Sequence, residues 1–371
     1  MRNDNRKRYW NGLIICSAAS LLAANACAQS TKVTAEELPA LSAPFDQKVS
    51  LALGSIEAAD MPVIVAYVHD DGEVQVKEYG ALVDDGIPPE LTQIDINSIT
   101  KTVTAIMAAK LVEQGKVRFD ERLDQFFDDV PADKAGITLH QLLTHSAGLK
   151  SDVGYDPEKI SKEEFLGRIF KSKLKSTPGD SFRYSNAGYG VVAAIIEERS
   201  GKTYEAFLRE DVIAGLGLTN TGYMSVYDDT RSIRTAKGKT ILEASWGGHE
   251  PYWNLIGNGG LVSTVPEMIG FRQAVVSGKV IPLDLLKVVQ TPHIKAIGFG
   301  ANFYGYGLFT EYVEDLGKIY WHDGGNDVLS AIWIDYPERG GDILFAAGAD
   351  SDKGDAFTAI WKLHTYIYRP R

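Results

Sequence analysis

Two parts of the chain alternate in the way that β-strands do, and they lie near its opposite ends. Near the start, the β-branched run 63–68 is followed by Asp70-Asp71-Gly72 and then by a run at 74–79 in which apolar and polar residues alternate. Two such runs around Asp-Gly predict an antiparallel hairpin. In the last third, further apolar runs joined by short connections that contain Gly or Pro predict an antiparallel meander. These runs cover residues 304–313, 318–321, 329–336 and 342–348.

Helical periodicity fills most of the chain between these two strand regions. The segment after Ser98 has apolar residues at 103, 106, 107 and 111 with alanines among them, which predicts a largely buried helix that stops at Gly115. Capping-box spacings at Ser161 and Thr264 predict the starts of two more helices, and Gly201 marks the end of another. Helical segments are also predicted over residues 44–55, 137–143, 204–212 and 356–368.

The order of these elements predicts the architecture. Strands at both ends with helices between them indicate a sheet domain that is interrupted by a helical insertion. We therefore expect an α+β fold, an antiparallel sheet flanked by helices. The sheet domain is assigned to residues 29–113 and 258–371, and the mainly helical insertion to residues 114–257.

The first 28 residues have the pattern of a secretory signal peptide. A basic stretch over residues 2–8 precedes an apolar run over 13–24, which is too short to span a bilayer, and Ala26-Cys27-Ala28 follows. Cleavage after Ala28 would export the protein to the periplasm or the medium. Cleavage after Ala26 is the alternative, and would leave Cys27 as a lipidated residue that anchors the chain to a membrane.

Composition narrows the classes of function. The chain has 371 residues, of which 44% are hydrophobic and 23% charged, as in a globular protein of one large or two closely joined domains. The net charge of −11 argues against nucleic acid or an acidic membrane surface as a partner. Both cysteines, Cys16 and Cys27, lie in the predicted signal peptide, so the mature chain would have no disulfide and no thiol nucleophile.

Ser98 and Lys101 open the predicted buried helix three residues apart. Residues at that spacing share a helix face, so the hydroxyl and the amine should meet. A serine becomes a good nucleophile only when a neighbouring base takes its proton. A desolvated lysine can be that base, because burial disfavours its charged form. The spacing alone is a common pattern, so it needs support from elsewhere in the chain.

Other catalytic signatures are absent from the sequence. There is no Gly-x-Ser-x-Gly, so the nucleophile elbow of the α/β-hydrolases is missing. The seven histidines form no recognised zinc spacing, and His140 and His145, five residues apart, are interpreted as structural. No Gly-x-Gly-x-x-Gly or Walker motif precedes a helix. We expect neither a metal nor a cofactor.

Three short stretches remain, and their order along the chain is informative. They are Ser98-Ile99-Thr100-Lys101, Tyr184-Ser185-Asn186 and His322-Asp323-Gly324-Gly325. Together with the flanking segments 111–116, 142–149 and 259–264, they resemble the serine β-lactamase and penicillin-binding protein superfamily. The likeness is closest to class C β-lactamases, family VIII esterases and D-amino-acid peptidases, and it covers nearly the whole mature chain. It implies that the expected α+β architecture is the β-lactamase/transpeptidase-like fold.

This resemblance implies a role for each matching residue. Ser98 would be the nucleophile that forms an acyl-enzyme, and Lys101 would share or take its proton. Tyr184 would be a second proton-transfer group, and the positive lysine would lower its pKa towards neutrality. Asn186 would orient Lys101 and the acyl amide of the substrate. The backbone N–H groups of Ser98 and Gly325 would form the oxyanion hole.

The third stretch departs from the family pattern. True β-lactamases carry Lys-Thr-Gly there, whereas this chain has His322-Asp323-Gly324. The lysine offers a fixed positive charge to the substrate carboxylate. A histidine is mostly neutral at pH 7 and would hold a carboxylate less well, since charge-assisted hydrogen bonds are about twice as strong. The substitution disfavours efficient β-lactam turnover.

The sequence therefore predicts an exported serine hydrolase that cleaves an ester or amide bond, including peptide bonds, through an acyl-serine intermediate. The substrate would be a small molecule or peptide, and export would place the enzyme where cell-wall fragments occur. A β-lactamase or D-Ala-D-Ala carboxypeptidase is one alternative. A protein that binds penicillin or cell-wall peptide with little turnover is the other.

Overall fold

The computed structural model describes residues 62–68, 72–79, 87–235, 237–298, 301–313 and 317–350. The predicted signal peptide over 1–28 lies outside these ranges, as do the predicted helices over 44–55 and 356–368.

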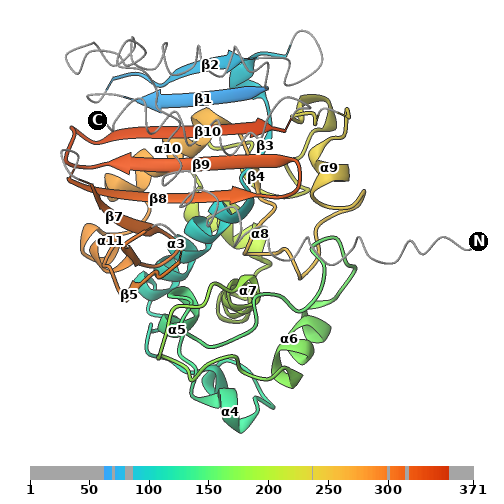
Figure 1. Cartoon of the computed structure of the whole chain (residues 1–371), viewed down its shortest axis with the longest axis vertical. Coiled ribbons are helices and arrows are strands. Elements are labelled where there is room, and N and C mark those ends of the chain that lie inside the picture. Colours follow the sequence, from blue (N-terminus) through green and yellow to red (C-terminus); the bar gives the residue numbers. More distant parts are fainter. Residues whose placement is uncertain are drawn as a thin grey trace, which may run out of the picture.

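Within the described residues, eight strands form one antiparallel sheet, in the order β2-β1-β10-β9-β8-β7-β6-β5 (Figure 1). The hairpin near the start of the chain joins the C-terminal meander through β1 and β10, with Val63 opposite Gly348. The predicted hairpin and meander are therefore confirmed, and they form a single sheet. The strands are β1 (Val63–Val68), β2 (Gln75–Tyr79), β5 (Ile294–Lys295), β6 (Phe303–Tyr304), β7 (Phe309–Val313), β8 (Gly317–Gly325), β9 (Leu329–Tyr336) and β10 (Asp342–Ala349).

One predicted strand is wrong as a continuous element. The run 304–313 is split into β6 and β7 by four residues that belong to neither strand. Gly307 adopts a left-handed φ of 71°, and a Cβ there would lie 2.5 Å from the carbonyl oxygen of Lys101. The chain leaves the sheet at this point because its backbone comes into direct contact with the helix that carries Lys101.

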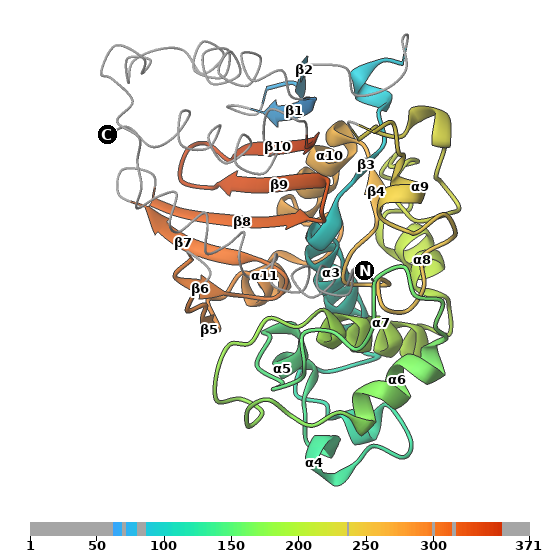
Figure 2. The ribbon, with the colours of Figure 1, turned by 45° about the vertical axis from the view of Figure 1, so that its right-hand side comes forward.

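Helices pack against the sheet and, with the loops between them, form the rest of the described chain (Figure 2). The helix α10 packs on β1 and β10, and α3 lies between the sheet region and α7. The predicted helix over 204–212 is α-helical only at its start and continues as a π-helical turn over Leu208–Val212. The sequence pattern did not predict α11. The helices are α3 (Thr100–Glu113), α4 (Ala132–Ala135), α5 (Leu139–Leu143), α6 (Lys162–Lys171), α7 (Asn186–Ser200), α8 (Tyr204–Phe207), α9 (Ile241–Ala244), α10 (Val265–Val276) and α11 (Leu283–Val289).

Shorter elements complete the described chain. A separate two-stranded ladder pairs β3 (Ile94–Asp95) with β4 (Val262–Ser263). Single turns of 3-10 helix occur at η2 (Pro89–Leu91), η3 (Asn97–Ile99), η4 (Leu123–Gln125) and η6 (Asp229–Arg231). The ladder matters most here, because β3 leads directly into η3 and so into α3.

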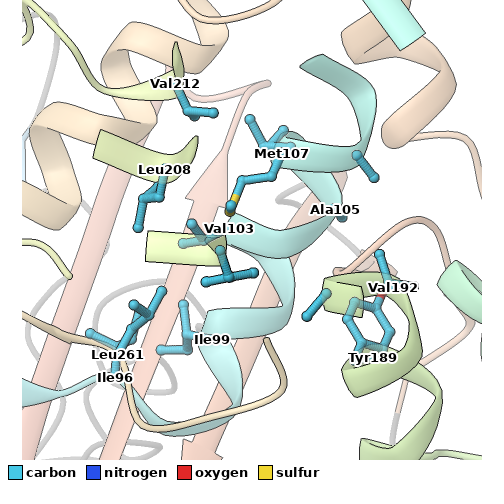
Figure 3. Packing of buried hydrophobic residues seen from close by; sticks show 14 of the residues in the cluster. Ile96, Ile99, Val103, Ala105, Met107, Tyr189, Val192, Leu208, Val212 and Leu261 are labelled. Atoms are coloured by element: carbon cyan, nitrogen blue, oxygen red, sulfur yellow. The ribbon is translucent and has the colours of Figure 1, made fainter. Parts of the chain in front are cut away.

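The helix α3 is the buried centre of the fold, as its periodicity predicts. Eleven of its fourteen residues are buried, and Figure 3 shows Val103 and Met107 on the side of Leu208 and Val212. The helix ends before Gly115, whose φ of 68° is the left-handed conformation of a C-terminal stop. Burial of this helix fixes the orientation of the polar residues at its beginning.

The threonines of α3 tie it to neighbouring segments. Thr104 donates its hydroxyl to the carbonyl of Gly257 at 2.6 Å, and Thr102 donates to the carbonyl of Gly307 at 2.5 Å. Buried hydroxyls are costly unless they are hydrogen-bonded, so these contacts allow polar residues in the core. They also bring the 257–261 segment alongside the start of the helix.

The predicted α+β architecture is confirmed, while the domain boundaries at 113/114 and 257/258 stay a prediction. In the described ranges, no helix combines the length and apolar character needed to cross a membrane.

Candidate active site

Ser98 lies in the tight turn η3 that leads into α3. The preceding residue, Asn97, has a φ of 47°, in the left-handed region that asparagine tolerates better than most residues. Its backbone N–H donates to Oδ1 of Asp95 at 2.6 Å, and its side chain donates to the backbone carbonyl of Asp95 at 3.2 Å. Asn97 and Ile99 are buried while Ser98 is partly exposed. The turn therefore presents one hydroxyl outward from a rigid backbone.

Lys101 is fully buried, and its amine reaches Ser98. Its Nζ donates to Oγ of Ser98 at 3.0 Å and to the backbone carbonyl of Asn258 at 2.6 Å. The hydroxyl and the amine meet, as their spacing predicts. A buried amine needs such partners, because desolvation disfavours its charge. This places a group that can exchange a proton with the hydroxyl at hydrogen-bond distance.

Asn258 is a contact that the sequence analysis missed. Its side chain donates to the carbonyl of Asn254 at 2.9 Å, which holds the loop so that its own carbonyl faces Lys101. The nearby carbonyl of Leu261 accepts from the N–H of Ile96 at 3.0 Å, just before the Ser98 turn. The one feature of the sequence that could have pointed to Asn258 is its position directly before Gly259-Gly260.

Tyr184 stands beside Lys101, in the segment that precedes α7. Nζ of Lys101 lies 4.9 Å from the centroid of its ring. The ring also packs against His145, with 4.3 Å between ring centroids and 35° between planes. Tyr184 and Lys101, which are 184 − 101 = 83 residues apart in the chain, therefore lie side by side, and Ser98 is hydrogen-bonded to the same lysine.

Asn186, the first residue of α7, is held by a residue that the sequence analysis did not single out. Its Nδ2 donates to Oδ1 of Asp152 at 2.8 Å. A carboxylate can only accept, so this contact fixes which way the amide is turned. The side-chain oxygen of Asn186, Oδ1, is buried and has no hydrogen-bond partner among the described residues. The predicted role of Asn186 in orienting Lys101 stays a prediction.

The end of strand β8 packs directly on the Ser98 turn. A Cβ at Gly324 would lie 2.4 Å from the backbone nitrogen of Ser98 and 2.7 Å from Cβ of Asn97. Only glycine fits at this distance. Gly325 follows at the end of the strand, opposite Ser330. The third stretch is therefore adjacent to the first, as two halves of one site require.

His322 lies two residues before Gly324 in β8 and is fully buried. Its Nδ1 is 2.5 Å from the backbone carbonyl of Asp323, and its Nε2 is 3.3 Å from the hydroxyl of Tyr304. Burial, with the positive charge of Lys101, lowers the pKa of His322 to about 3. The ring is therefore neutral at pH 7, and it supplies no fixed positive charge at the site.

No group of three or more His, Cys, Asp or Glu side chains is arranged to hold a metal ion in the part of the chain that the structure describes.

Two bacterial proteins are similar in sequence to this chain. The chain is 22% identical over 325 residues to penicillin-binding protein 4* of Bacillus subtilis, a match covering 81% of this chain and 68% of that protein. It is 28% identical over 229 residues to the D-alanyl-D-alanine-carboxypeptidase/endopeptidase AmpH of Escherichia coli, covering 57% of each chain. This chain therefore spans little more than half of the second relative.

Solved structures share the fold. A β-lactamase/D-alanine carboxypeptidase from Yersinia pestis superposes with a TM-score of 0.71 at 20% identity, covering 87% of this chain and 98% of the other. A D-amino acid amidase from Ochrobactrum anthropi gives 0.70 at 20% identity, with the same coverage. The predicted β-lactamase/transpeptidase-like fold is thus confirmed.

The family model described as Beta-lactamase matches residues 45–363, which includes all three stretches of the site. The resemblance seen in the sequence is confirmed, and the chain belongs to the Beta-lactamase family as one of its serine hydrolases.

Proposed function

We propose that this protein hydrolyses ester or amide bonds, including peptide bonds, through an acyl intermediate on Ser98. The observation that carries the proposal is the 3.0 Å contact between Oγ of Ser98 and Nζ of the fully buried Lys101. A lone exposed serine has no base to activate it, whereas this one has a neighbour at proton-transfer distance.

Acylation begins when Lys101 takes the proton of Ser98 and Oγ attacks the substrate carbonyl. The backbone N–H groups of Ser98 and Gly325 stabilise the negative charge that develops on the carbonyl oxygen. One such donor is typically worth about 3 kcal/mol of transition-state stabilisation. The close packing of Gly324 on Ser98 supports this arrangement, since it brings the two peptide units to the same place.

Tyr184 delivers a proton to the leaving group. In the second half of the reaction its phenolate takes a proton from the water that attacks the acyl group, and Lys101 returns its proton to Oγ of Ser98 as the acid is released. Its ring beside Nζ of Lys101 supports this assignment, because a cation stabilises a phenolate. The carbonyl of Asn258 also accepts from Nζ of Lys101, which helps to hold the amine beside Ser98 and the ring of Tyr184.

The substrate that we propose is a small ester, amide or peptide, with fragments of the cell wall as the natural source. Two observations support this choice over a β-lactam. His322 is buried and neutral, so it gives no charged anchor for a carboxylate. The relatives named above include a carboxypeptidase/endopeptidase and a D-amino acid amidase. Export to the periplasm or the medium, proposed from residues 1–28, would bring the enzyme to such substrates.

A substrate panel tests the proposal. Wild-type protein and the Ser98→Ala and Lys101→Met variants are compared on p-nitrophenyl butyrate, nitrocefin and a D-Ala-D-Ala peptide. We expect turnover of the ester or the peptide that exceeds turnover of nitrocefin. Ser98→Ala should abolish it, and Lys101→Met should lower kcat by about 10²–10⁴-fold. A folded Ser98→Ala protein that keeps wild-type turnover would contradict the mechanism. A stoichiometric burst with fluorescent penicillin and no steady state would favour a binding protein.

A further inference from the structure

His145 lies in the loop after α5, in the 142–149 stretch for which the sequence suggested no function. It is 1% exposed. Its φ of 56° lies in the left-handed region, where histidine, asparagine and aspartate are enriched among residues other than glycine. A buried polar residue with a strained backbone is held there by its surroundings, and its contacts indicate what it holds in turn.

Two hydrogen bonds link His145 to the residues on either side of Tyr184. The backbone N–H of Arg183 donates to the carbonyl oxygen of His145 at 2.7 Å. The backbone N–H of Ser185 donates to Nδ1 of its ring at 3.1 Å. The ring of Tyr184 between them packs on the imidazole, with centroids 4.3 Å apart. One residue therefore fixes the backbone before Tyr184, the backbone after it and the face of its ring.

The contact with Ser185 also determines the form of the imidazole. Because the backbone N–H is the donor, Nδ1 must be unprotonated, and the ring proton sits on Nε2. Burial, with the positive charge of Lys101, lowers the pKa of His145 well below its usual value, so the neutral form persists. Its Nε2 is buried with no hydrogen-bond partner among the described residues. This nitrogen therefore offers no visible route for a proton relay.

We propose that neutral His145 is a positioning residue, which holds Tyr184 against Lys101 through the Nδ1 acceptor and the packing of its ring. The inference rests on the proposed role of Tyr184 in the reaction. Loss of the acceptor would leave the N–H of Ser185 unpaired and release the backbone on one side of Tyr184. Misplacement of a catalytic group by about 1 Å can lower the rate by about a hundredfold.

Two substitutions separate the acceptor from the ring. His145→Phe keeps a ring and removes the acceptor. His145→Asn keeps an acceptor on the same side-chain branch, and asparagine tolerates the left-handed backbone. Each is combined with Tyr184→Phe in a double-mutant cycle, because a residue that acts through Tyr184 should lose its effect when the Tyr184 hydroxyl is gone. Circular dichroism and thermal unfolding establish that each variant is folded.

With p-nitrophenyl butyrate, we expect His145→Phe to lower kcat by about 10- to 100-fold with little change in KM. In the Tyr184→Phe background, His145→Phe should lower kcat by less than about threefold. With Tyr184 intact, His145→Asn should lower kcat by less than about tenfold. A loss in His145→Phe that is undiminished by Tyr184→Phe would overturn the inference. If His145→Phe does not fold, a loss above a hundredfold in folded His145→Asn would overturn it as well.

The same experiment distinguishes this inference from the proposed function. A folded Tyr184→Phe enzyme with wild-type kcat would remove the role of Tyr184, and the inference with it, while Ser98 chemistry is judged separately by Ser98→Ala.

Discussion

Replacing Gly324 with alanine tests how closely the end of β8 is fitted to the Ser98 turn. The added Cβ would lie 2.4 Å from the backbone nitrogen of Ser98, and 3.1 Å from the carbonyl carbon of Asn97. Ordinary contacts between such atoms are about 3.5–4.0 Å, so the two segments must separate by about 1 Å. Gly324 is paired with Ala331 of β9, which resists movement of the strand. The Ser98 turn is then the part that moves.

The magnitude follows from that displacement. Moving the nucleophile and one oxyanion donor by about 1 Å should lower kcat/KM by about a hundredfold. Overpacking should reduce the free energy of unfolding by about 1–3 kcal/mol. The assays are p-nitrophenyl butyrate hydrolysis and equilibrium unfolding in urea.

The matched control is Gly167→Ala in the middle of α6, where an added Cβ meets nothing within 4 Å. This change should leave activity unaltered and raise the free energy of unfolding by about 0.5–1 kcal/mol, because glycine is costly inside a helix. A folded Gly324→Ala enzyme with kcat/KM within twofold of wild type would show that the end of β8 does not constrain the Ser98 turn.

Two further predictions concern stability. Burial raises the pKa of Asp95 to about 6 from 3.8, so the folded state holds the extra proton and the free energy of unfolding falls as pH rises from about 4 to 6. Asp95→Asn should therefore stabilise the protein at pH 7.5, by up to about 3 kcal/mol, and hardly at pH 4; urea unfolding with an equal gain at both pH values would contradict this. Arg272 and Asp335 form an ion pair in which the side chains are 5% and 6% exposed, and Asp335 also accepts from Nε1 of Trp333 at 2.7 Å. Arg272→Met should lower the free energy of unfolding by about 3–5 kcal/mol, and adding Asp335→Leu should recover most of that loss. Thermal unfolding in which the double variant is no more stable than Arg272→Met would contradict the stabilising role of the ion pair.

The local pattern predicted most of the elements that carry the site. The runs at 63–68 and 329–336 are strands with the same bounds, because their β-branched and aromatic residues are buried on both faces. The serine and lysine could be paired from the sequence because a helix brings residues three apart together.

The rest of the site depends on contacts between distant segments. The carbonyl of Asn258 is 157 residues from the Lys101 amine that it accepts from, and Asp152 is 34 residues from Asn186. A backbone carbonyl has no signature in a sequence, and an aspartate in a loop is ordinary. The break between β6 and β7 has the same origin, since the approach of Gly307 to α3 is set by packing and not by local preference.

The proposed reaction depends on an acyl group carried by Ser98. The most direct measurement is the intact mass of the protein after reaction with a fluorophosphonate, followed by peptide mapping of wild type and Ser98→Ala. We predict one adduct per chain, located on the peptide that contains Ser98 and absent from Ser98→Ala. An adduct of the same extent on Ser98→Ala, or a wild-type enzyme that hydrolyses esters while Ser98 stays unmodified, would contradict the account.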